Sequence, residues 1–591
     1  MNKKFVGMAT VLALTSATLV ACGGDKKANT TNNEVETADV AKFPVESKNE
    51  KKAIKDGTLD VAVVADSSFR GLFSAELYED NVDMQFMRPS HESLFTTDED
   101  FVITNDGPAK LDLDVENKKA TITIQKDLTW SDGEKVTADD LIWPYEIIGH
   151  KDYTGVRYDN NMTNIIGMED YHDGKSETIS GIKKVDDKTI TIEYKDVNPG
   201  LLQSGGGIWE NAAPKHAMKD IPVKDLASSD IVRKRPITFG PYVMTNVVNG
   251  EAVEYQPNKY YYKGAPKLAK INFTSVASAS IVEALKAKKY DMVVSMPTDI
   301  YSTYKDLENY SVLGRPELSY TYLGFKLGKW DKAQGQVIPN PDAKMADEKL
   351  RQAMGYAVNN DEVGKKFYNG LRTNATTLIP PVFKSLHDKD IKGYTQNKEK
   401  ARDLLKEAGY KDKDGDGFVE DKNGKKLVIK FASMSGGETA QPLADYYIQE
   451  WKDIGLNVEL ATGRLIDVQS FYDKLKNDDP EIDIYQGAWG TGTDPSPTGL
   501  YGRHSFFNHG RFADEENDKL LEAIDSKESF DPEKRQEAFY NWQKYASKKA
   551  FVIPTLYRTE VMPVHDRVTG LDWHQNNFYM WSEIGVSQEK R

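Results

Sequence analysis

A single cysteine, Cys22, stands in a chain of 591 residues, and it constrains the fold more than any other feature. One cysteine cannot form a disulfide within its own chain, so a domain of this size must be stabilised by the burial of apolar surface. Cys22 follows two lysines near the start, an apolar run over residues 5–20, and Ala21. A positive start, an apolar run shorter than the ~20 residues that span a membrane, and a small residue before a cut site are typical of a secretory signal.

The position of Cys22 predicts a bacterial lipoprotein. We expect residues 1–21 to be a signal peptide, the thiol of Cys22 to be alkylated by diacylglycerol, and its amine to be acylated, for example with palmitate. Two or more acyl chains hold a soluble domain on a lipid bilayer far better than one. The expected location is therefore the extracellular face of the cytoplasmic membrane. An ordinary secretory signal with an unmodified cysteine is the alternative.

Length and charge narrow the class of protein. Residues 22–56 are polar and predict a disordered tether, whereas ordered structure is expected from the buried-strand pattern of Thr58–Val64 onward. The rest of the chain is too long for one core, so two or more domains are expected. The net charge of −15 does not suit a nucleic-acid binder, and we expect no nucleic-acid partner.

The pattern of apolar residues predicts a mixture of strands and helices. Residues 120–124 and 189–194 alternate with the period of a strand, and Thr137 with Asp140 forms the acidic variant of a helix capping box. Further strands are expected at 426–431 and 455–460. Helices are expected at 279–289, 346–358, 397–408, 438–454, 515–526 and 531–549. Helix, short turn and strand follow one another often enough to favour α/β layers.

Five segments, in one order along the chain, carry a family resemblance. They are Lys126–Asp140, Pro236–Tyr242, Pro257–Pro266, Leu350–Val358 and Leu404–Tyr410. Together they resemble the peptide- and nickel-binding family of extracellular solute-binding proteins, family 5. The lipoprotein start adds a likeness to the oligopeptide-binding lipoproteins of low-GC Gram-positive bacteria.

The resemblance implies a bilobed α/β fold of the periplasmic-binding-protein type, in the three-subdomain variety of type II. Lobe I would cover residues 57–316 and 559–591 and carry an extra subdomain, and lobe II would cover 317–558. Two hinge crossings would then lie near Leu318–Thr321 and Pro554–Tyr557. Both are short extended stretches, as a hinge between two lobes requires.

The resemblance also implies a monomeric receptor and not an enzyme. An oligopeptide would lie extended between the two lobes, which close over it and present it to the permease subunits of an ABC importer. A strand edge can pair the main chain of a peptide whatever its side chains are. The alternatives are a dedicated receptor for one peptide pheromone and, less favoured, a surface hydrolase or adhesin on the same scaffold.

A buried peptide amine needs a carboxylate partner, and in the family this acid lies in the segment that matches residues 483–495. Relatives commonly carry an aspartate three positions after the tryptophan, where this chain has Gly492, and one type carries it at the position of Gln486. Asp494 is therefore favoured over Asp483. A turn cap before Pro495 is the alternative role of Asp494. If neither acid reaches the amine, the receptor would prefer blocked ends, read internal residues, or hold the amine with carbonyl groups.

The remaining ligand-binding candidates come from the same segment, from the end of the first strand, and from near the end of the chain. The first strand matters because ligands approach the carboxyl ends of strands in open α/β sheets. These candidates are Tyr485, Gln486, Gly487, Trp489, Ser67, Phe69 and Trp573. Packing in the core is the alternative role of the aromatic residues.

No cofactor or metal site is predicted. Asp412–Gly417 matches the start of a calcium loop, but the twelfth position is Asn423 where a bidentate glutamate belongs. Glu420 at the ninth position compensates only in part, so a polar hairpin is favoured and calcium is left open. The nine histidines lack metal-binding spacing. No phosphate loop or GxSxG nucleophile motif occurs, and we expect no catalytic residues.

Overall fold

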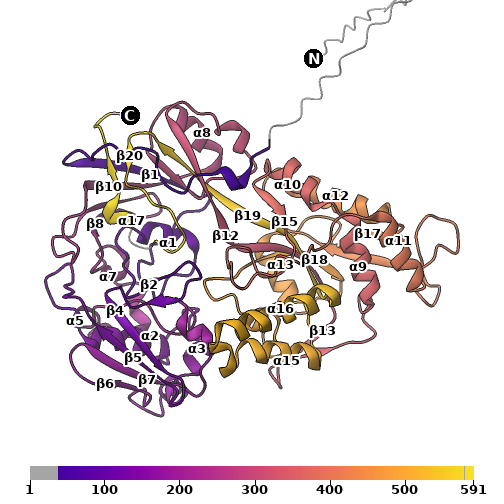
Figure 1. Cartoon of the computed structure of the whole chain (residues 1–591), viewed down its shortest axis with the longest axis horizontal. Helices are drawn as coiled ribbons and strands as arrows, with labels where there is room; N and C mark the ends of the chain where they lie inside the picture. Colours follow the sequence, from indigo (N-terminus) through magenta and orange to yellow (C-terminus); the bar gives the residue numbers. More distant parts are fainter. Residues whose placement is uncertain (1–36, 578–579) are drawn as a thin grey trace, which may run out of the picture. The chain divides into compact units, whose positions relative to one another are not determined.

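The computed structural model (Figure 1) describes residues 37–577 and 580–591, so the predicted signal peptide, Cys22 and the first part of the predicted tether lie outside the described residues. The described residues belong to one unit, Thr37–Arg591. Within them, no helix has both the length and the apolar character needed to cross a membrane.

One large mixed sheet runs through the molecule, in the order β17-β16-β18-β12-β19-β11-β1-β10-β9-β8, with β15 also paired to β19. Its strands are β1 (Gly57–Val64), β8 (Tyr242–Val248), β9 (Ala252–Pro257), β10 (Leu268–Val276), β11 (Met292–Val294), β12 (Tyr310–Phe325), β15 (Arg372–Asn374), β16 (Val428–Ala432), β17 (Asn457–Leu460), β18 (Ile484–Gly490) and β19 (Val552–His565). The two longest strands, β12 and β19, cross the middle of the molecule and connect its two ends (Figure 1).

The pairing of β12 with β19 is interrupted in the middle of both strands. Pro316 pairs with Thr559, and the next pair is Tyr320 with Tyr557, so three residues of β12 oppose Arg558 alone. A second irregularity follows directly after Thr321. Such bulges bend a sheet and increase its twist. The crossing segments predicted at 318–321 and 554–557 coincide with this interruption.

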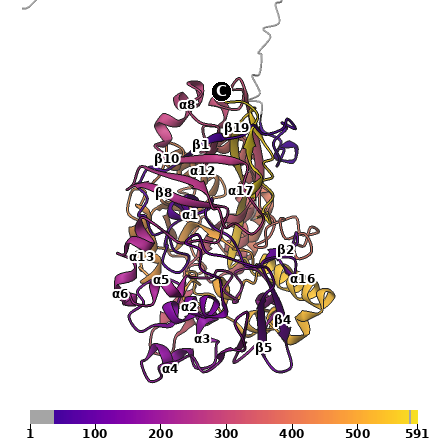
Figure 2. The ribbon, with the colours of Figure 1, turned by 90° about the vertical axis from the view of Figure 1, so that its left-hand side faces the viewer.

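A separate antiparallel sheet has the order β4-β5-β7-β6, from β4 (Ala109–Asp114), β5 (Lys119–Ile124), β6 (Ile182–Lys184) and β7 (Thr189–Glu193). The alternation predicted over 120–124 and 189–194 is confirmed, because alternate residues of β5 and β7 are buried. Helix α2 (Ala138–Gly149) begins with the predicted capping box of Thr137 and Asp140. Figure 2 shows β4 and β5 at the lower end of the molecule, well below β1, β8 and β10.

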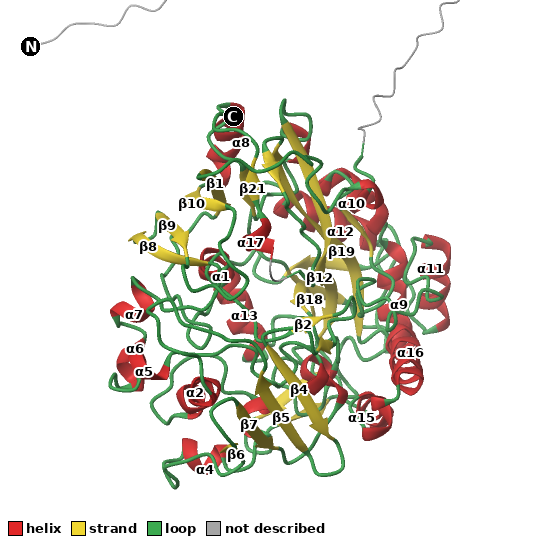
Figure 3. Cartoon of the chain, turned by 60° about the vertical axis from the view of Figure 1, so that its left-hand side comes forward, coloured by secondary structure: helices red, strands yellow, loops and turns green. Residues whose placement is uncertain are grey.

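The six predicted helices are all present, with ends that differ from the predicted ones by no more than three residues. They are α8 (Ser278–Lys286), α9 (Glu348–Ala357), α11 (Lys398–Glu407), α12 (Ala440–Lys452), α15 (Glu515–Ile524) and α16 (Pro532–Lys549). Figure 3 shows α9, α11 and α16 on one side of the strands β12, β18 and β19. The mixed α/β architecture that was predicted is therefore present.

The described residues form four groups of buried apolar side chains, of which the smallest lies around α8 and includes Ile281 and Leu371. The other three follow the sheets. Core 1 lies on the β1–β10 part of the large sheet and includes Leu59, Phe273 and Met562. Core 2 surrounds the four-stranded sheet and is built from residues between Leu72 and Phe239. Core 3 covers the β16–β18 part and is built from residues between Tyr320 and Tyr557, together with Phe101.

The segment predicted as a tether is ordered over its last part, residues 37–56. Main-chain hydrogen bonds join Ser47 to Leu571 (2.9 Å) and Ile54 to Val586 (2.9 Å), and the Val45 carbonyl accepts from Trp573 (2.8 Å). The ring of Phe43 packs against Gly314, where a Cβ atom would lie 2.6 Å from it. Polar composition did not reveal this order, because main-chain hydrogen bonds to distant segments hold the chain in place.

Candidate functional site

Strand β18 presents Tyr485, Gly487 and Trp489 on one face. Gly487 pairs with Tyr322 of β12, and a Cβ atom on Gly487 would lie 2.8 Å from the Tyr322 ring. That ring is nearly parallel to Trp489, with centroids 6.4 Å apart, and it meets Tyr485 edge-on at 5.9 Å. Glycine at 487 is therefore required to let an aromatic layer form across the two strands. Tyr485 lies within this layer, fully buried, whereas Trp489 lies at its partly exposed margin.

His509 extends the aromatic layer beside Trp489. The two rings stack with centroids 5.5 Å apart, and Phe507 meets Trp489 edge-on at 5.8 Å. His509 is 2% exposed, and neither of its ring nitrogens has a hydrogen-bond partner among the described residues. Burial, followed by the charges of Arg511 and Lys326, lowers the pKa of His509 to about 3, so the ring is neutral at physiological pH.

The chain that follows β18 contacts the part of the molecule that holds core 2. The hydroxyl of Thr493 donates to the Ser204 carbonyl. The side-chain amide of Gln203 donates to the Thr493 carbonyl (3.2 Å) and to the Asp100 carbonyl (3.1 Å). Residues that are almost 300 positions apart in the sequence thus meet at the end of β18.

Asp494 follows Thr493 directly. We call the place where residues 493 and 494 meet Gln203 and Ser204 the junction. Oδ1 of Asp494 lies 3.6 Å from Nη2 of Arg535 and accepts the main-chain N–H of Ser496 (3.1 Å). Burial raises the pKa of Asp494, and the positive charge of Arg535 opposes that shift. Arg535 also donates to Oε1 of Gln203 (2.7 Å), while its Nε has no partner among the described residues. The hydrogen bond to Ser496 agrees with the role of a turn cap, and the neighbouring arginine supplies a positive charge that a peptide amine would have to replace.

Phe101 also belongs to this junction, although it was not among the predicted site residues. It comes from the segment between β2 (Thr96–Thr97) and the four-stranded sheet, yet it is 1% exposed and packs within core 3. Its ring meets Phe383 edge-on at 5.6 Å. Its φ is +64°, an uncommon value for an aromatic residue that persists only where surrounding contacts enforce it.

Asp483 lies at the opposite end of β18 from Asp494. Its Oδ2 accepts the main-chain N–H of Lys430 (2.8 Å) and the ammonium of Lys344 (2.6 Å). Gln486, on the face of β18 away from Trp489, accepts from the Ser433 hydroxyl at 3.5 Å. The two candidate acids are thus separated by a whole strand, and only Asp494 is near the junction.

The remaining candidates lie outside the aromatic layer. Phe69 packs in core 1, 4.3 Å from the ring of Phe86, and Ser67 is exposed after β1. Trp573 is buried, with the guanidinium of Arg315 4.2 Å above its ring. The predicted residues are therefore not all in one place.

The loop at Asp412 forms a polar hairpin. The carboxylates of Asp412, Asp414 and Asp416 lie close together and are exposed, and Asp412 accepts the main-chain N–H of Gly415 (2.7 Å). Glu420 accepts the N–H of Lys413 (2.7 Å). The loop is thus closed by its own hydrogen bonds.

Comparison with known proteins gives a consistent result. The model of "Bacterial extracellular solute-binding proteins, family 5 Middle" matches residues 109–508. The oligopeptide-binding protein OppA of Lactococcus lactis subsp. cremoris (strain SK11) is 38% identical over 600 residues, which cover 100% of this chain and 99% of that protein. AppA of Bacillus subtilis (strain 168), also an oligopeptide-binding protein, is 23% identical over 595 residues, 97% of each chain.

Solved structures of similar proteins have the same fold as this chain. Lactococcal OppA, complexed with an endogenous peptide in the closed conformation, has a TM-score of 0.79 and 38% identity, over 90% of this chain and 100% of that one. Bacillus subtilis AppA in complex with a nonapeptide has a TM-score of 0.69 at 20% identity, over 91% of this chain and 100% of that one. The likeness confirms the predicted α/β fold of the periplasmic-binding-protein type.

Proposed function

Because the chain belongs to family 5 of the bacterial extracellular solute-binding proteins, we propose that it is a receptor that captures extended oligopeptides and delivers them to the permease of an ABC importer. The observation that carries this proposal is the full-length 38% identity to OppA, whose peptide-bound structure has the same fold. A family of binding proteins also fits a site built from aromatic rings and hydrogen-bonding groups.

In the proposed arrangement, residues 57–316 and 559–591 form lobe I, and residues 317–558 form lobe II. The separation of core 3 from cores 1 and 2 supports this division. The interrupted pairing of β12 and β19 supports a hinge at 318–321 and 554–557, because fewer hydrogen bonds need to change there when the lobes move.

The peptide would lie near the end of β18, between the lobes. Buried polar atoms around this junction have no hydrogen-bond partner among the described residues: Thr97 Oγ1, Asp100 Oδ1 and Arg535 Nε. Buried polar groups are normally paired, so these are the atoms that the main chain of a peptide, or water around it, would satisfy.

Native mass spectrometry of the protein purified from its cells tests the function. We expect intact peptides of mixed sequence to co-purify with it. One peptide alone would assign the dedicated pheromone receptor. Fragments that accumulate when pure protein is incubated with a peptide would assign a hydrolase and overturn the proposal.

Replacing Asp494 with asparagine should weaken the binding of a free-amine peptide by about 10-fold, or about 1.4 kcal/mol, and that of its N-acetylated form much less. The reason is that only the free amine carries the charge that a carboxylate opposes. Calorimetric titration of both peptides measures the difference. Asp483→Asn is the matched control, because Asp483 lies at the other end of β18. Equal losses for the two peptides would remove Asp494 from the amine site.

Replacing Cys22 with alanine should release the protein into the culture medium, because acyl chains are the proposed membrane anchor. The measurement is the fraction of protein in the medium and in the membrane. Incorporation of labelled palmitate into the wild type, and its loss in the variant, is the control. Retention of the variant on the membrane would contradict lipid anchoring.

A further inference from the structure

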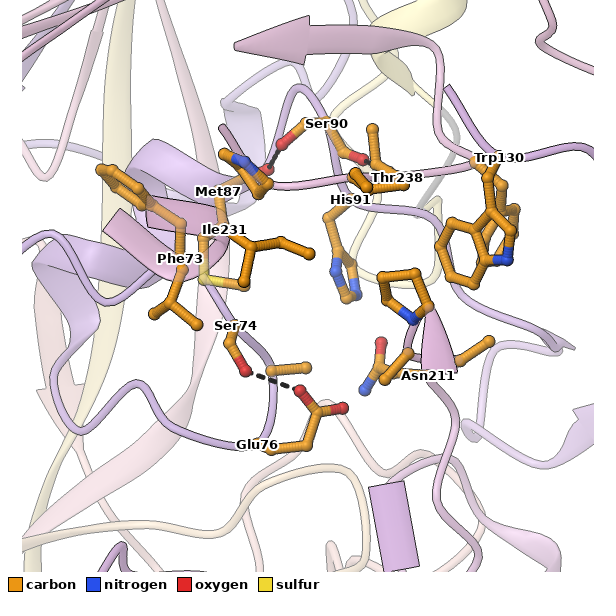
Figure 4. Close-up of a pocket in the computed structure, with 18 of the residues that line it drawn as sticks. Phe73, Ser74, Glu76, Met87, Ser90, His91, Trp130, Asn211, Ile231 and Thr238 are labelled. Carbon is orange, nitrogen blue, oxygen red and sulfur yellow. Dashed lines mark hydrogen bonds between the residues drawn. The ribbon is translucent and has the colours of Figure 1, made fainter. Parts of the chain in front are cut away.

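A pocket with a volume of about 80 Å³ lies between core 1 and core 2, among residues other than those of the Asp494 junction (Figure 4). Its apolar wall comes from both cores: Phe73 and Met87 belong to core 1, and Trp130 and Phe239 belong to core 2. The pocket therefore lies in the seam where the four-stranded-sheet part packs on the large sheet.

Three polar side chains converge in this pocket. Figure 4 shows the imidazole of His91, the carboxyl group of Glu76 and the carboxamide of Asn211 pointing toward one another. Glu76 is 3% exposed; its Oε2 accepts from the Ser74 hydroxyl (2.6 Å), but its Oε1 has no hydrogen-bond partner among the described residues. Oδ1 of Asn211 is likewise buried and unpaired. An unpaired buried acceptor is costly, so these two oxygens favour a donor; the indole N–H of Trp209 acts on Glu76 and lowers its pKa, but it too lacks a hydrogen-bond partner among the described residues.

The charges around the pocket favour a cation as that donor. Glu76 and Glu92 line it, and its lining contains no lysine or arginine. Burial raises the pKa of Glu76, and a bound cation would oppose that shift. Burial, followed by the charge of Arg88, lowers the pKa of His91 to about 4, so at neutral pH the imidazole offers one ring nitrogen as an acceptor. The charges of Arg88, Arg157 and Lys263 act on His91, Glu76 and Glu92 from outside the lining, so an anion in the pocket would meet the two carboxyl groups first.

The choice between a metal ion and an ammonium ion follows from the arrangement of the ligands. Among the described residues, two groups of three side chains could hold a metal ion, and neither lies in this pocket. They are Asp412, Asp414 and Asp416, and Glu46, Asp572 and His574. The pocket instead combines one carboxyl group, one amide and one imidazole with a large apolar wall. A primary ammonium carries three N–H donors, one for each of these acceptors, and an alkyl group that suits the wall.

We propose that this pocket binds a small primary alkylammonium ion, with N–H groups donating to Glu76, Asn211 and His91 and the alkyl group against Phe73 and Met87. A cavity of about 150 Å³ binds benzene, so a pocket of this volume has room for about three or four non-hydrogen atoms. Ethylammonium fits that limit. Its binding would stabilise the seam between core 1 and core 2, at a site separate from the peptide.

Titration of the whole protein with ethylammonium chloride tests this site, with saturation-transfer NMR as the readout. We expect saturable binding with a Kd of about 1 mM, near the limit for a ligand of three non-hydrogen atoms. Ethanol has the same number of heavy atoms without the charge and should not bind. Glu76→Gln should weaken ethylammonium binding at least 10-fold, whereas Glu177→Gln, at an exposed position, should leave it unchanged.

Several outcomes would overturn the proposal. If the wild type shows no saturable binding of ethylammonium, the pocket holds only water. If ethanol binds equally well, the pocket does not select a charged ligand. Unchanged affinity in Glu76→Gln would place the ion elsewhere, and displacement by a peptide would place it in the peptide site. If Glu76→Gln fails to fold, ethylammonium and ethanol are compared on the wild type alone, with and without peptide. That comparison still shows whether the protein binds the charged ligand at a site separate from the peptide.

Discussion

Replacing Asp291 with alanine is expected to lower the free energy of unfolding by about 4 kcal/mol. Asp291 is 0% exposed, and its two oxygens accept from Arg567 at 2.6 and 2.8 Å and from Arg591 at 2.8 and 3.0 Å. Oδ2 also accepts the main-chain N–H of Asp60 (2.8 Å), which ties the cluster to β1. Without the carboxylate, Arg567, which is 4% exposed, becomes a buried charge that has lost its ion-pair partner.

The same carboxyl group predicts how this difference depends on pH. Burial alone would raise the pKa of Asp291, but hydrogen bonds from Arg567 and Arg591 outweigh it, and the pKa lies below its ordinary value of 3.8. An acid with a lowered folded-state pKa contributes stability that is present above the unfolded-state pKa and is lost as the pH falls through the folded-state pKa. The gap between wild type and variant should therefore be full at neutral pH and shrink below about pH 4.

Urea unfolding followed by tryptophan fluorescence, at neutral pH and at several acidic values, measures both effects. Asp566→Ala, at an exposed position one residue before Arg567, is the control and should change stability by less than about 0.5 kcal/mol. A loss below about 1 kcal/mol for Asp291→Ala at neutral pH would show that the cluster does not depend on this carboxylate.

Replacing Phe101 with alanine is expected to weaken peptide binding by about 100-fold. Under the proposed function, Phe101 belongs to one lobe and inserts into core 3 of the other, so its packing exists only when the lobes are closed. Truncating a buried phenylalanine costs about 3 kcal/mol or more, and that cost would fall on the closed, peptide-holding state. The peptide should also dissociate faster, because the closed state is the one destabilised.

Phe273→Ala is the matched control for Phe101→Ala. Phe273 is equally buried, but it lies in core 1 and packs on Phe86 and Tyr255, away from the junction. That variant should lose stability against urea while the folded protein keeps its peptide affinity. Stopped-flow release of a fluorescent peptide compares the two. Equal release rates for wild type and Phe101→Ala would show that Phe101 does not hold the closed state.

Local patterns predicted the regular elements of this protein well. The six expected helices have periodic apolar faces and clear ends, and Thr137 with Asp140 fixes the start of α2 within its own turn. Apolar and polar residues alternate along β5 and β7 because one face of the sheet is buried. These features depend on residues within a few positions of one another, so the sequence contains them directly.

The candidate site was predicted only in part. Asp494 and Trp489 lie where the expected segment places them, near the end of β18. Gln203, Arg535 and Phe101 were not selected, although they surround Asp494 or its neighbours. Each resembles an ordinary surface or core residue in its own segment, and only the meeting of distant segments gives it a role.

The amino-acid sequence alone determined that this is a mixed α/β protein of the solute-binding family. Local periodicity and the series of family segments can both be read from the order of residues along the chain. Tertiary structure alone decided which carboxyl groups face an arginine, which aromatic ring enters the core of another part, and which buried acceptors stay unpaired. Those properties depend on burial and on distances between segments that are hundreds of residues apart, and chain order does not specify them.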